Sequence, residues 1–204
     1  MKVLELFAGS RSVGKVAEVL GYEVFSSDIN AFDGIDYVVD ILDFEEGYVP
    51  FVPDIIWASP PCTSYSIAAI SHHRKDGIAT SDFAKKSDMM MARLQEILEY
   101  FLKLNPDLIY YVENPRGMLR KMPFMSYYPI RNTITYCQYG DSRMKPTDIW
   151  TNNFNWKPRA MCKNGDSCHT AAPRGSRTGT QGLKGNYERS VVPPVLCAEA
   201  LISI

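Results

Sequence analysis

The chain has 204 residues, 46% of them hydrophobic, and a formal net charge of −1. This length provides one buried domain with a small appendage and excludes two full domains. No apolar run approaches the roughly 20 residues of a membrane span, and the first residues lack the basic start and apolar stretch of a signal peptide. Five cysteines at uneven spacing indicate a reducing compartment rather than a disulfide framework. We therefore expect a cytoplasmic protein with no membrane association.

Short β-rich runs alternate with helical patterns along most of the chain. In chain order we predict strand 3–7, helix 12–20, strands 22–26, 37–39 and 54–58, helix 83–104, strands 108–112, 133–136 and 148–150, and helix 191–204. Strands separated by helices predict an α/β fold with a doubly wound, mostly parallel sheet. After Trp150 no clear period survives among the many glycine, proline, asparagine and basic residues, which predicts a small irregular C-terminal subdomain.

Basic residues are concentrated in the later part of the chain. Up to Asn114 there are nine Lys and Arg against eighteen Asp and Glu, whereas from Pro115 to Arg189 there are thirteen against four. A polyanion would dock on this later part. A basic face that merely keeps the protein in solution explains the same charges equally well.

The first candidate site follows the predicted strand 3–7, where the chain turns through Gly9 and reaches Gly14 in the next helix. Glycine lets backbone amides approach a polar or anionic cofactor group at a helix N-terminus, although an ordinary tight turn has the same composition. Asp28 follows the next predicted strand, and Asp40 follows the third. Carboxylates at this edge of an α/β sheet accept hydrogen bonds from ribose hydroxyls or lie beside an adenine amine, unless they cap helices instead.

Cys62 follows two prolines at the carboxyl end of the predicted strand 54–58. Pro60 and Pro61 restrict the backbone and remove two hydrogen-bond donors, so they present the cysteine at the sheet edge. A thiol ionises more readily than a hydroxyl and becomes a stronger nucleophile where positive potential lowers its pKa. A lone cysteine is more often structural, but the double proline favours a nucleophile here.

Glu113 and Asn114 follow the predicted strand 108–112 at the same edge of the sheet. A carboxyl group in this place can supply the proton that a ring nitrogen needs during catalysis. Taken singly, Glu113 fits a helix cap or a surface charge equally well. Together with Cys62 it forms an acid and nucleophile pair.

These motifs, in this order, resemble those of the DNA cytosine-5 methyltransferases. The resemblance spans nearly the whole chain and rests on Phe7-Ala8-Gly9, Pro60-Pro61-Cys62, Glu113-Asn114, a shortened arginine-x-arginine motif from Tyr139 to Lys145, and Ser190-Val191-Val192-Pro193-Pro194. It implies a Rossmann-like fold that binds S-adenosyl-L-methionine. The residues that it assigns to the cofactor are Phe7, Ala8, Gly9, Gly14, Asp28, Asp40, Pro60 and Ser190.

The resemblance also implies a mechanism. Cys62 attacks carbon 6 of a cytosine flipped out of double-stranded DNA, while Glu113 holds ring nitrogen 3 and the exocyclic amine. Carbon 5 then takes the methyl group and loses its proton to a base, Cys62 is eliminated, and Arg143 orients the ring. In the same family pattern Phe7 packs on the adenine, Asp28 binds the ribose and Asp40 lies at the adenine amine.

The chain departs from the family pattern at three places. Arg11 replaces the second glycine of the cofactor loop, and Pro115 follows the glutamate-asparagine pair where the family usually has valine. We expect a catalytic and cofactor-binding domain at 1–151, a short target-recognition-like subdomain at 152–188 and a returning segment at 189–204. So short a recognition region resembles enzymes of phages and prophages, which suggests restriction-modification in a bacterial or phage-infected host cell and few base-specific contacts.

Cys162, Cys168 and His169 form a C-x5-C-H cluster in the predicted subdomain. Structural zinc takes four ligands, and a fourth comes here only through the fold, from Cys137 or Cys197. The sequence therefore leaves zinc binding and a zinc-free subdomain as alternatives.

Two other functions stay open. A methyltransferase acting on the exocyclic amine of cytosine or adenine typically has an aromatic residue after the double proline, where this chain has Cys62. A non-catalytic nucleic-acid-binding relic of the fold is favoured only by Arg11. RNA in place of DNA stays open as the substrate, and we expect a monomer.

Overall fold

The computed structural model describes residues 1–170 and 186–204, and its main feature is a seven-stranded sheet. The strands of this sheet are β1 (Lys2–Leu6), β2 (Glu23–Asp28), β3 (Tyr37–Val38), β4 (Ile55–Ala58), β7 (Ile109–Pro115), β8 (Ile130–Thr135) and β9 (Pro146–Thr151). A separate hairpin pairs β5 (Arg74–Lys75) with β6 (Ile78–Ala79).

The helices connect and cover the strands of the main sheet. They are α1 (Ser12–Val19), α2 (Ile70–His73), α3 (Asp82–Leu104), α4 (Asn186–Ser190) and α5 (Pro194–Leu201). Short 3-10 turns occur at η1 (Ile41–Asp43), η2 (Glu46–Tyr48), η3 (Thr63–Tyr65), η4 (Met118–Lys121), η5 (Pro123–Tyr127) and η6 (Tyr136–Tyr139).

The strand order is β3-β2-β1-β4-β7-β9-β8, in which β3, β2, β1, β4 and β7 run parallel and β9 and β8 are antiparallel. The chain builds outward from β1 to β3 on one side and then crosses to β4 on the other side. In open α/β sheets such a switch leaves a crevice outside the carboxyl ends of the two central strands, where ligands bind. The topology thus places the candidate site at the ends of β1 and β4.

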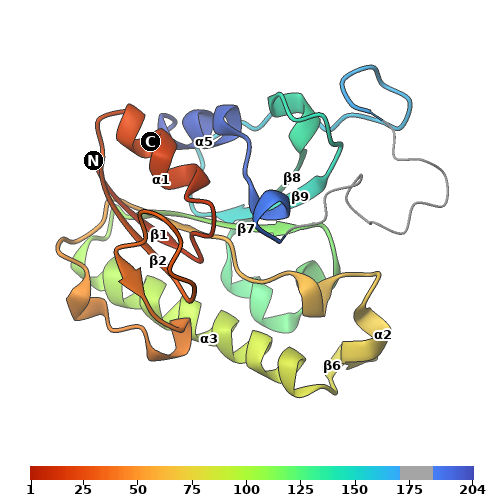
Figure 1. The fold of residues 1–204 in the computed structure, drawn as a ribbon, viewed down its shortest axis with the longest axis horizontal. Coiled ribbons are helices and arrows are strands. Elements are labelled where there is room, and N and C mark those ends of the chain that lie inside the picture. The colour runs from red at the N-terminus through yellow and green to blue at the C-terminus, as the bar shows by residue number, and fades with distance from the viewer. Residues whose placement is uncertain (171–185) are drawn as a thin grey trace.

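Helices cover both faces of the sheet. Figure 1 shows α1 and α5 on one face and the long α3 on the opposite face, with the sheet between them. The strand 55–58 is apolar and fully buried, as expected for a parallel strand that is covered on both sides. Helix α3 begins at Ser81, whose hydroxyl accepts the Ala84 backbone N–H at 3.1 Å, and it turns Met91 and Leu94 toward the sheet.

The predicted fold class is confirmed. Each predicted strand and all three predicted helices occur, with ends that differ by at most three residues, and β7 continues beyond the predicted 112 to Pro115. Residues 152–170 contain neither helix nor strand, in agreement with the irregular subdomain expected there, whereas residues 171–185 of that subdomain lie outside the described part. Among the described residues, no helix has the length and apolarity needed to cross a membrane.

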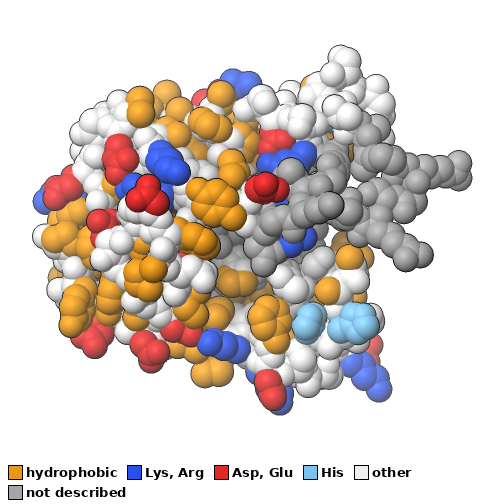
Figure 2. Space-filling view, in the orientation of Figure 1, with side chains coloured by type: hydrophobic (Ala, Val, Ile, Leu, Met, Phe, Trp, Pro, Cys, Tyr) orange, Lys and Arg blue, Asp and Glu red, His pale blue; other side chains and the backbone are white. Residues whose placement is uncertain are grey.

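The surface agrees with the unequal distribution of charge along the sequence. On the face in Figure 2, acidic side chains gather over the elements of the N-terminal part, around α1, β2 and β3. Histidine side chains lie at the surface over α2, where His72 is exposed and His73 is half-buried. The His73 ring bonds the Ser81 hydroxyl at 2.9 Å, so it helps to hold α2 beside the start of α3.

Candidate active site

Strand pairing brings the three predicted motifs to one edge of the sheet. Leu6 of β1 pairs with Ala58 of β4, and Ala58 pairs with Val112 of β7. The cofactor loop (residues 7–11), the nucleophile loop (residues 59–66) and Glu113 each follow one of these residues directly. They are therefore neighbours at the carboxyl edge, although up to about a hundred residues separate them in sequence.

The cofactor loop is tied to the end of β2. The Gly9 backbone N–H donates to the Asp28 carboxylate at 2.9 Å, and the Asn30 backbone N–H donates to its other oxygen at 2.9 Å. Gly9 has a φ of 51°, and a Cβ built on it would lie 3.3 Å from the Ser190 hydroxyl oxygen. The structure thus brings Gly9, Asp28 and Ser190, which sequence analysis assigned to one cofactor, into one place.

Glu5 of β1 completes this part of the site, and sequence analysis did not identify it. Its buried carboxylate accepts the backbone N–H groups of Val13 and Gly14, each at 3.1 Å, at the N-terminus of α1. A Cβ at Gly14 would lie 2.7 Å from this carboxylate, so only glycine lets the helix approach so closely. Burial raises the pKa of Glu5 to about 7, against the lowering effect of these hydrogen bonds. One acid within an otherwise apolar strand was the available signal.

Arg11, which stands where the family pattern has a glycine, has a backbone conformation that glycine adopts easily. Its φ of 54° and ψ of 38° lie in the left-handed region, which costs an L-residue about 1–2 kcal/mol. The side chain is held by Ser26, whose hydroxyl accepts from Nε at 3.1 Å, and by Glu18, which pairs with Nη2 at 2.5 Å. The arginine is therefore anchored to β2 and α1, and its contacts offset the strain of the loop.

Two substitutions at Arg11 separate the strain from these contacts. Arg11→Ala keeps the left-handed backbone and loses the contacts with Ser26 and Glu18, so we expect it to lower the free energy of unfolding by about 2 kcal/mol. Arg11→Gly also relieves the backbone, so it should cost about 1 kcal/mol less than alanine. Urea unfolding of both variants measures the difference. Equal stability of the two would contradict a strained arginine.

Asp40 has a different environment from Asp28. Its carboxylate accepts the Leu42 backbone N–H at 3.1 Å, which caps η1, and it pairs with Lys86 of α3 at 2.6 Å. The hydrogen bond from Lys86 lowers the pKa of Asp40. The structure therefore bears out the helix-cap alternative for this residue, while a role at the adenine amine stays a prediction.

The nucleophile loop is braced from two sides. On one side, the Asn114 side-chain amide donates to the Pro60 carbonyl at 2.8 Å. On the other side, the buried Arg74 donates to the Ser64 carbonyl at 3.1 Å and pairs with Asp88 of α3 at 2.6 Å. Cys62 lies between these supports, partly exposed, at the start of η3. Sequence analysis did not identify Arg74, because its effect on the loop depends on α3.

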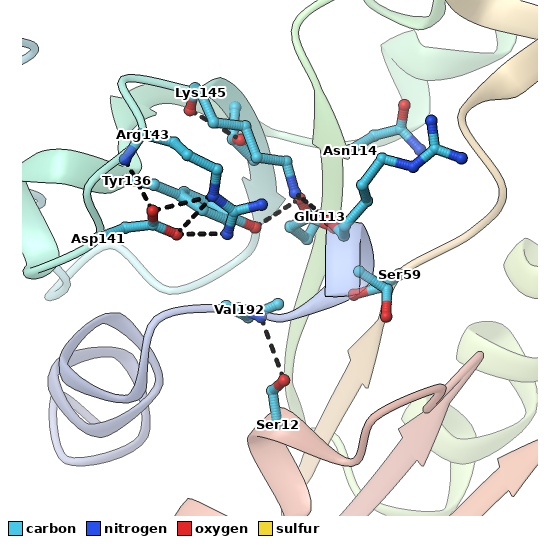
Figure 3. Close-up of polar contacts among 12 residues, drawn as sticks. Ser12, Ser59, Glu113, Asn114, Tyr136, Asp141, Arg143, Lys145 and Val192 are labelled. Atoms are coloured by element: carbon cyan, nitrogen blue, oxygen red, sulfur yellow. Dashed lines mark hydrogen bonds and ion pairs between the residues drawn. The ribbon is translucent and has the colours of Figure 1, made fainter. Parts of the chain in front are cut away.

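Glu113 lies beside two side chains from the antiparallel part of the sheet, Tyr136 after β8 and Lys145 before β9. The Tyr136 hydroxyl donates to Glu113 Oε1 at 2.8 Å, and Lys145 Nζ lies 4.0 Å from the same oxygen and 4.3 Å from the centre of the Tyr136 ring. Figure 3 shows Tyr136 and Lys145 extending toward Glu113. Sequence analysis included Lys145 only as the end of a motif, and the structure places it beside the predicted acid.

The groups around Cys62 have opposite effects on the pKa of its thiol. Burial and the Glu113 carboxylate raise the pKa of the Cys62 thiol, while the positive charges of Lys145 and Arg189 lower it. Burial in turn lowers the pKa of Lys145. The positive potential expected near the thiol is present, but its effect on the pKa is smaller than that of burial.

Arg143 is the third predicted catalytic residue, and it is bound to Asp141. Its Nε donates to the two carboxylate oxygens at 2.9 and 3.0 Å, and Nη2 also contacts this carboxylate. The remaining nitrogen, Nη1, is buried and has no hydrogen-bond partner among the described residues, and Figure 3 shows this side chain beside Tyr136. A free buried donor is suited to an incoming acceptor, so the predicted contact with the base is retained as a prediction.

The C-terminal segment closes the site against α1. The Val192 backbone N–H donates to the Ser12 hydroxyl at 3.1 Å, and α5 packs on α1 (Figure 3, Figure 1). The Lys145 amino group donates to the Arg189 carbonyl at 3.1 Å. Residues near the end of the chain therefore support both the cofactor loop and the surroundings of Glu113.

The predicted metal-binding trio of Cys162, Cys168 and His169 is brought together. Cys137 of η6 joins it, and we call these four residues the cysteine–histidine cluster. Cys197, the other candidate for a fourth ligand, is buried in the core on α5. The structure thus decides between the two cysteines that sequence analysis left open.

Comparisons with known proteins agree with this geometry. No protein-family model matches the chain. A protein of Frog virus 3 (isolate Goorha), named probable DNA (cytosine-5)-methyltransferase, is 30% identical over 222 residues, which cover 98% of this chain and 99% of the relative. Among solved structures, a mutant of Spodoptera frugiperda DNMT2 matches at a TM-score of 0.50 and 17% identity over 79% of this chain. S. pombe Dnmt2 matches at 0.49 and 14% over 78%.

The two kinds of likeness support different conclusions. The chain spans 53% and 51% of the two solved structures, about half of each, and the first of them supports the Rossmann-like methyltransferase fold. The viral relative matches over nearly its whole length and nearly the whole of this chain. The chain belongs to the DNA (cytosine-5)-methyltransferase family.

Proposed function

We propose that this protein transfers a methyl group from S-adenosyl-L-methionine to carbon 5 of cytosine in double-stranded DNA, through a covalent bond between Cys62 and the base. The observation that carries the proposal is the shared sheet edge, where pairing of β1, β4 and β7 aligns the cofactor loop, the nucleophile loop and Glu113. A cofactor methyl group, a thiol and an acid are the three groups that this reaction needs side by side.

The residues at the end of β1 and β2 fit the cofactor. Asp28 is partly exposed, so its carboxylate can accept hydrogen bonds from ribose hydroxyls, and the absence of a side chain on Gly9 lets the Ser190 hydroxyl lie close to the cofactor loop. The free backbone N–H groups at the N-terminus of α1 donate to the Glu5 carboxylate, and the N-cap residue Arg11 makes no side-chain cap hydrogen bond. When bound, S-adenosyl-L-methionine supplies an electrophilic methyl group on a sulfonium.

Cys62 supplies the electrons that make the ring carbon reactive. Carbon 5 of cytosine is a weak nucleophile, so the thiolate first adds to carbon 6, and the ring electrons move to carbon 5. After carbon 5 has accepted the methyl group it loses its proton to a base, the bond from carbon 6 to the sulfur breaks, and Cys62 leaves as a thiolate. The thiol reaches carbon 6 only when the cytosine has left the base stack.

Glu113 holds the ring during this addition. Negative charge develops at ring nitrogen 3 as the thiolate adds, and in the proposed reaction Glu113 transfers a proton to that nitrogen and accepts a hydrogen bond from the exocyclic amine. Tyr136 donates to one oxygen of Glu113 and so determines which oxygen faces the base. Arg143, with its free Nη1, contributes a donor toward the ring.

Lys145 supplies a positive charge between the acid and the nucleophile. It lowers the pKa of the thiol, and its charge also stabilises negative charge on the ring. Lys145→Gln removes this charge, so we expect a rate about tenfold lower at neutral pH and a pH–rate profile that shifts toward higher pH. Lys145→Arg keeps the charge and should keep the profile near that of the wild type. Single-turnover methylation across pH measures both, and an unshifted profile in Lys145→Gln would refute this role.

The segment that could recognise a DNA sequence is short. Between the end of β9 and the start of α4 the chain has 34 residues, 152–185, and those described contain no helix or strand. Because only contacts to base edges specify a sequence, we expect a short or relaxed recognition site. We also expect the protein to act as a monomer.

Product analysis tests the proposal and its alternatives together. The protein is incubated with radiolabelled S-adenosyl-L-methionine and either duplex DNA or RNA, and the nucleosides are separated after digestion. We expect 5-methylcytosine from DNA. Methyl groups on the exocyclic amine of cytosine or adenine would establish the first alternative, transfer to RNA alone would change the substrate, and no transfer despite cofactor binding would indicate a non-catalytic relic.

A further inference from the structure

A second chemical centre lies outside the proposed reaction site. In the cysteine–histidine cluster, Cys137 comes from η6, and the other three residues come from the irregular segment 152–170. Cys137 and Cys162 are buried, while Cys168 and His169 are partly exposed. All four ligand atoms lie within 4.8 Å of one another.

Three of four distances between these atoms fall in the range of a tetrahedral metal site, and the Cys137–Cys162 distance is shorter. The Sγ atoms of Cys137 and Cys162 are 3.1 Å apart, and those of Cys137 and Cys168 are 3.5 Å apart. His169 Nδ1 lies 3.7 Å from the sulfur of Cys162 and 3.5 Å from that of Cys168. Ligands bound to one zinc at about 2.3 Å for sulfur and 2.0–2.1 Å for nitrogen lie roughly 3.5–3.8 Å apart.

From this arrangement we propose that the protein binds one structural zinc ion through Cys137, Cys162, Cys168 and His169. Three thiolates and an imidazole form a closed set of soft ligands, which selects zinc over magnesium or calcium. The cysteines lose their protons to solvent as the metal binds. Four protein ligands leave no open position, so the zinc has a structural role and takes no part in methyl transfer.

Neighbouring groups support the thiolates and the turn that carries them. The Gln138 side-chain amide donates to the Cys168 sulfur at 3.4 Å, the kind of outer contact that stabilises a bound thiolate. The Cys162 backbone N–H donates to the Thr135 hydroxyl at 3.0 Å, which docks the irregular segment on the end of β8. This segment has no helix or strand of its own, so it lacks the regular backbone hydrogen bonds that order other parts of the chain. A bound metal would stabilise its conformation instead.

The zinc ion also connects the irregular segment to the reaction site. Cys137 directly follows Tyr136, whose hydroxyl donates to Glu113. At the far end of the cluster, the Thr170 backbone N–H donates to the Ser142 carbonyl at 2.9 Å, next to Arg143. Through these neighbours in sequence, the metal helps to position Tyr136 and the loop that carries Arg143. It does so from outside the reaction site and does not contact the substrate.

Metal content is the first test. Protein purified without an affinity tag or chelator from zinc-containing medium should carry about one zinc per chain. Cys168→Ser and His169→Ala should each reduce this to below about a tenth, because three ligands do not retain the metal through purification. Cys197→Ala removes a buried cysteine outside the cluster and should keep the full zinc content. Metal-free wild-type protein, or zinc retained by both cluster variants, would overturn the proposal.

A disulfide between Cys137 and Cys162 is the competing explanation for the short sulfur distance, and a thiol count distinguishes it. Denatured in chelator without reductant, the zinc protein should show all five thiols, whereas a disulfide would leave three. A second readout does not depend on any variant folding. Wild-type protein reconstituted with cobalt should show the visible bands of tetrahedral cobalt and a thiolate charge-transfer band, and octahedral cobalt would overturn the site.

Discussion

Replacing Cys62 with alanine should abolish methylation, lowering turnover by more than about 10⁴-fold. Carbon 5 has no other source of electrons in the proposed reaction, so no neighbouring group substitutes for the thiol. Because Cys62 is partly exposed and makes no side-chain hydrogen bond that caps η3, the variant should fold and bind the cofactor normally. Single-turnover methylation and calorimetric binding of S-adenosyl-L-homocysteine measure the two properties separately.

The matched control for this variant is Cys197→Ala. Cys197 is a buried cysteine on α5 that packs in the core and lies outside the nucleophile loop, so its replacement tests whether loss of any thiol impairs the enzyme. We expect it to keep methyl transfer. If Cys62→Ala retained methylation within about tenfold of the wild type, the reaction would need no covalent step.

Glu113→Gln should lower the rate of methyl transfer by about 10²- to 10⁴-fold. Glutamine has the size of glutamate and still accepts from Tyr136, but its amide has no acidic proton to transfer to ring nitrogen 3. The loss should appear in the chemical step, measured in a single turnover, while the affinity for S-adenosyl-L-homocysteine changes little.

Tyr136→Phe is the control for Glu113→Gln, because it removes the hydrogen bond to the carboxylate and leaves the carboxylate itself in place. Burial and Glu113 raise the pKa of Tyr136 well above its usual value, so its hydroxyl stays a donor throughout the pH range of the assay. We expect a loss of about tenfold, well below that of Glu113→Gln. A larger loss from Tyr136→Phe would mean that the tyrosine, and not the glutamate, is the main group acting on the ring.

Local patterns in the sequence predicted the elements of this fold well. Buried parallel strands such as 55–58 appear as short apolar runs, and the long helix α3 appears as a periodic pattern closed by Asn105 and Pro106. The strand order and the antiparallel direction of β8 and β9 did not follow from these patterns. They depend on pairing between segments far apart in the chain, such as Glu113 with Ile149.

The same distinction applies to the site. Cys62 lies in the loop after β4 and Glu113 lies near the carboxyl end of β7, so their place at the sheet edge was predictable from the sequence. Lys145, Arg74 and Cys137 act on partners from other elements, and their roles became visible only when the fold brought those partners close.

Arg11 illustrates a further limit of a pattern-based prediction. In the sequence, Arg11 stands where the family pattern has the second glycine of the cofactor loop. It was the one feature that favoured a non-catalytic relic. In the structure it has a left-handed conformation, which glycine adopts easily, and it is anchored by Ser26 and Glu18. The contacts of a substituted residue, which its place in a motif does not reveal, can therefore stabilise a loop conformation that favours glycine.

Trapping of the covalent adduct tests the central claim most directly. The protein is incubated with S-adenosyl-L-methionine and DNA that contains 5-fluorocytosine, and the products are separated on a denaturing gel. Fluorine does not leave carbon 5 as a proton does, so the bond between Cys62 and carbon 6 should persist, and the wild-type protein should migrate as a complex with DNA. Cys62→Ala should give no complex. A complex that forms equally with Cys62→Ala, or none with an active wild-type enzyme, would contradict covalent catalysis by Cys62.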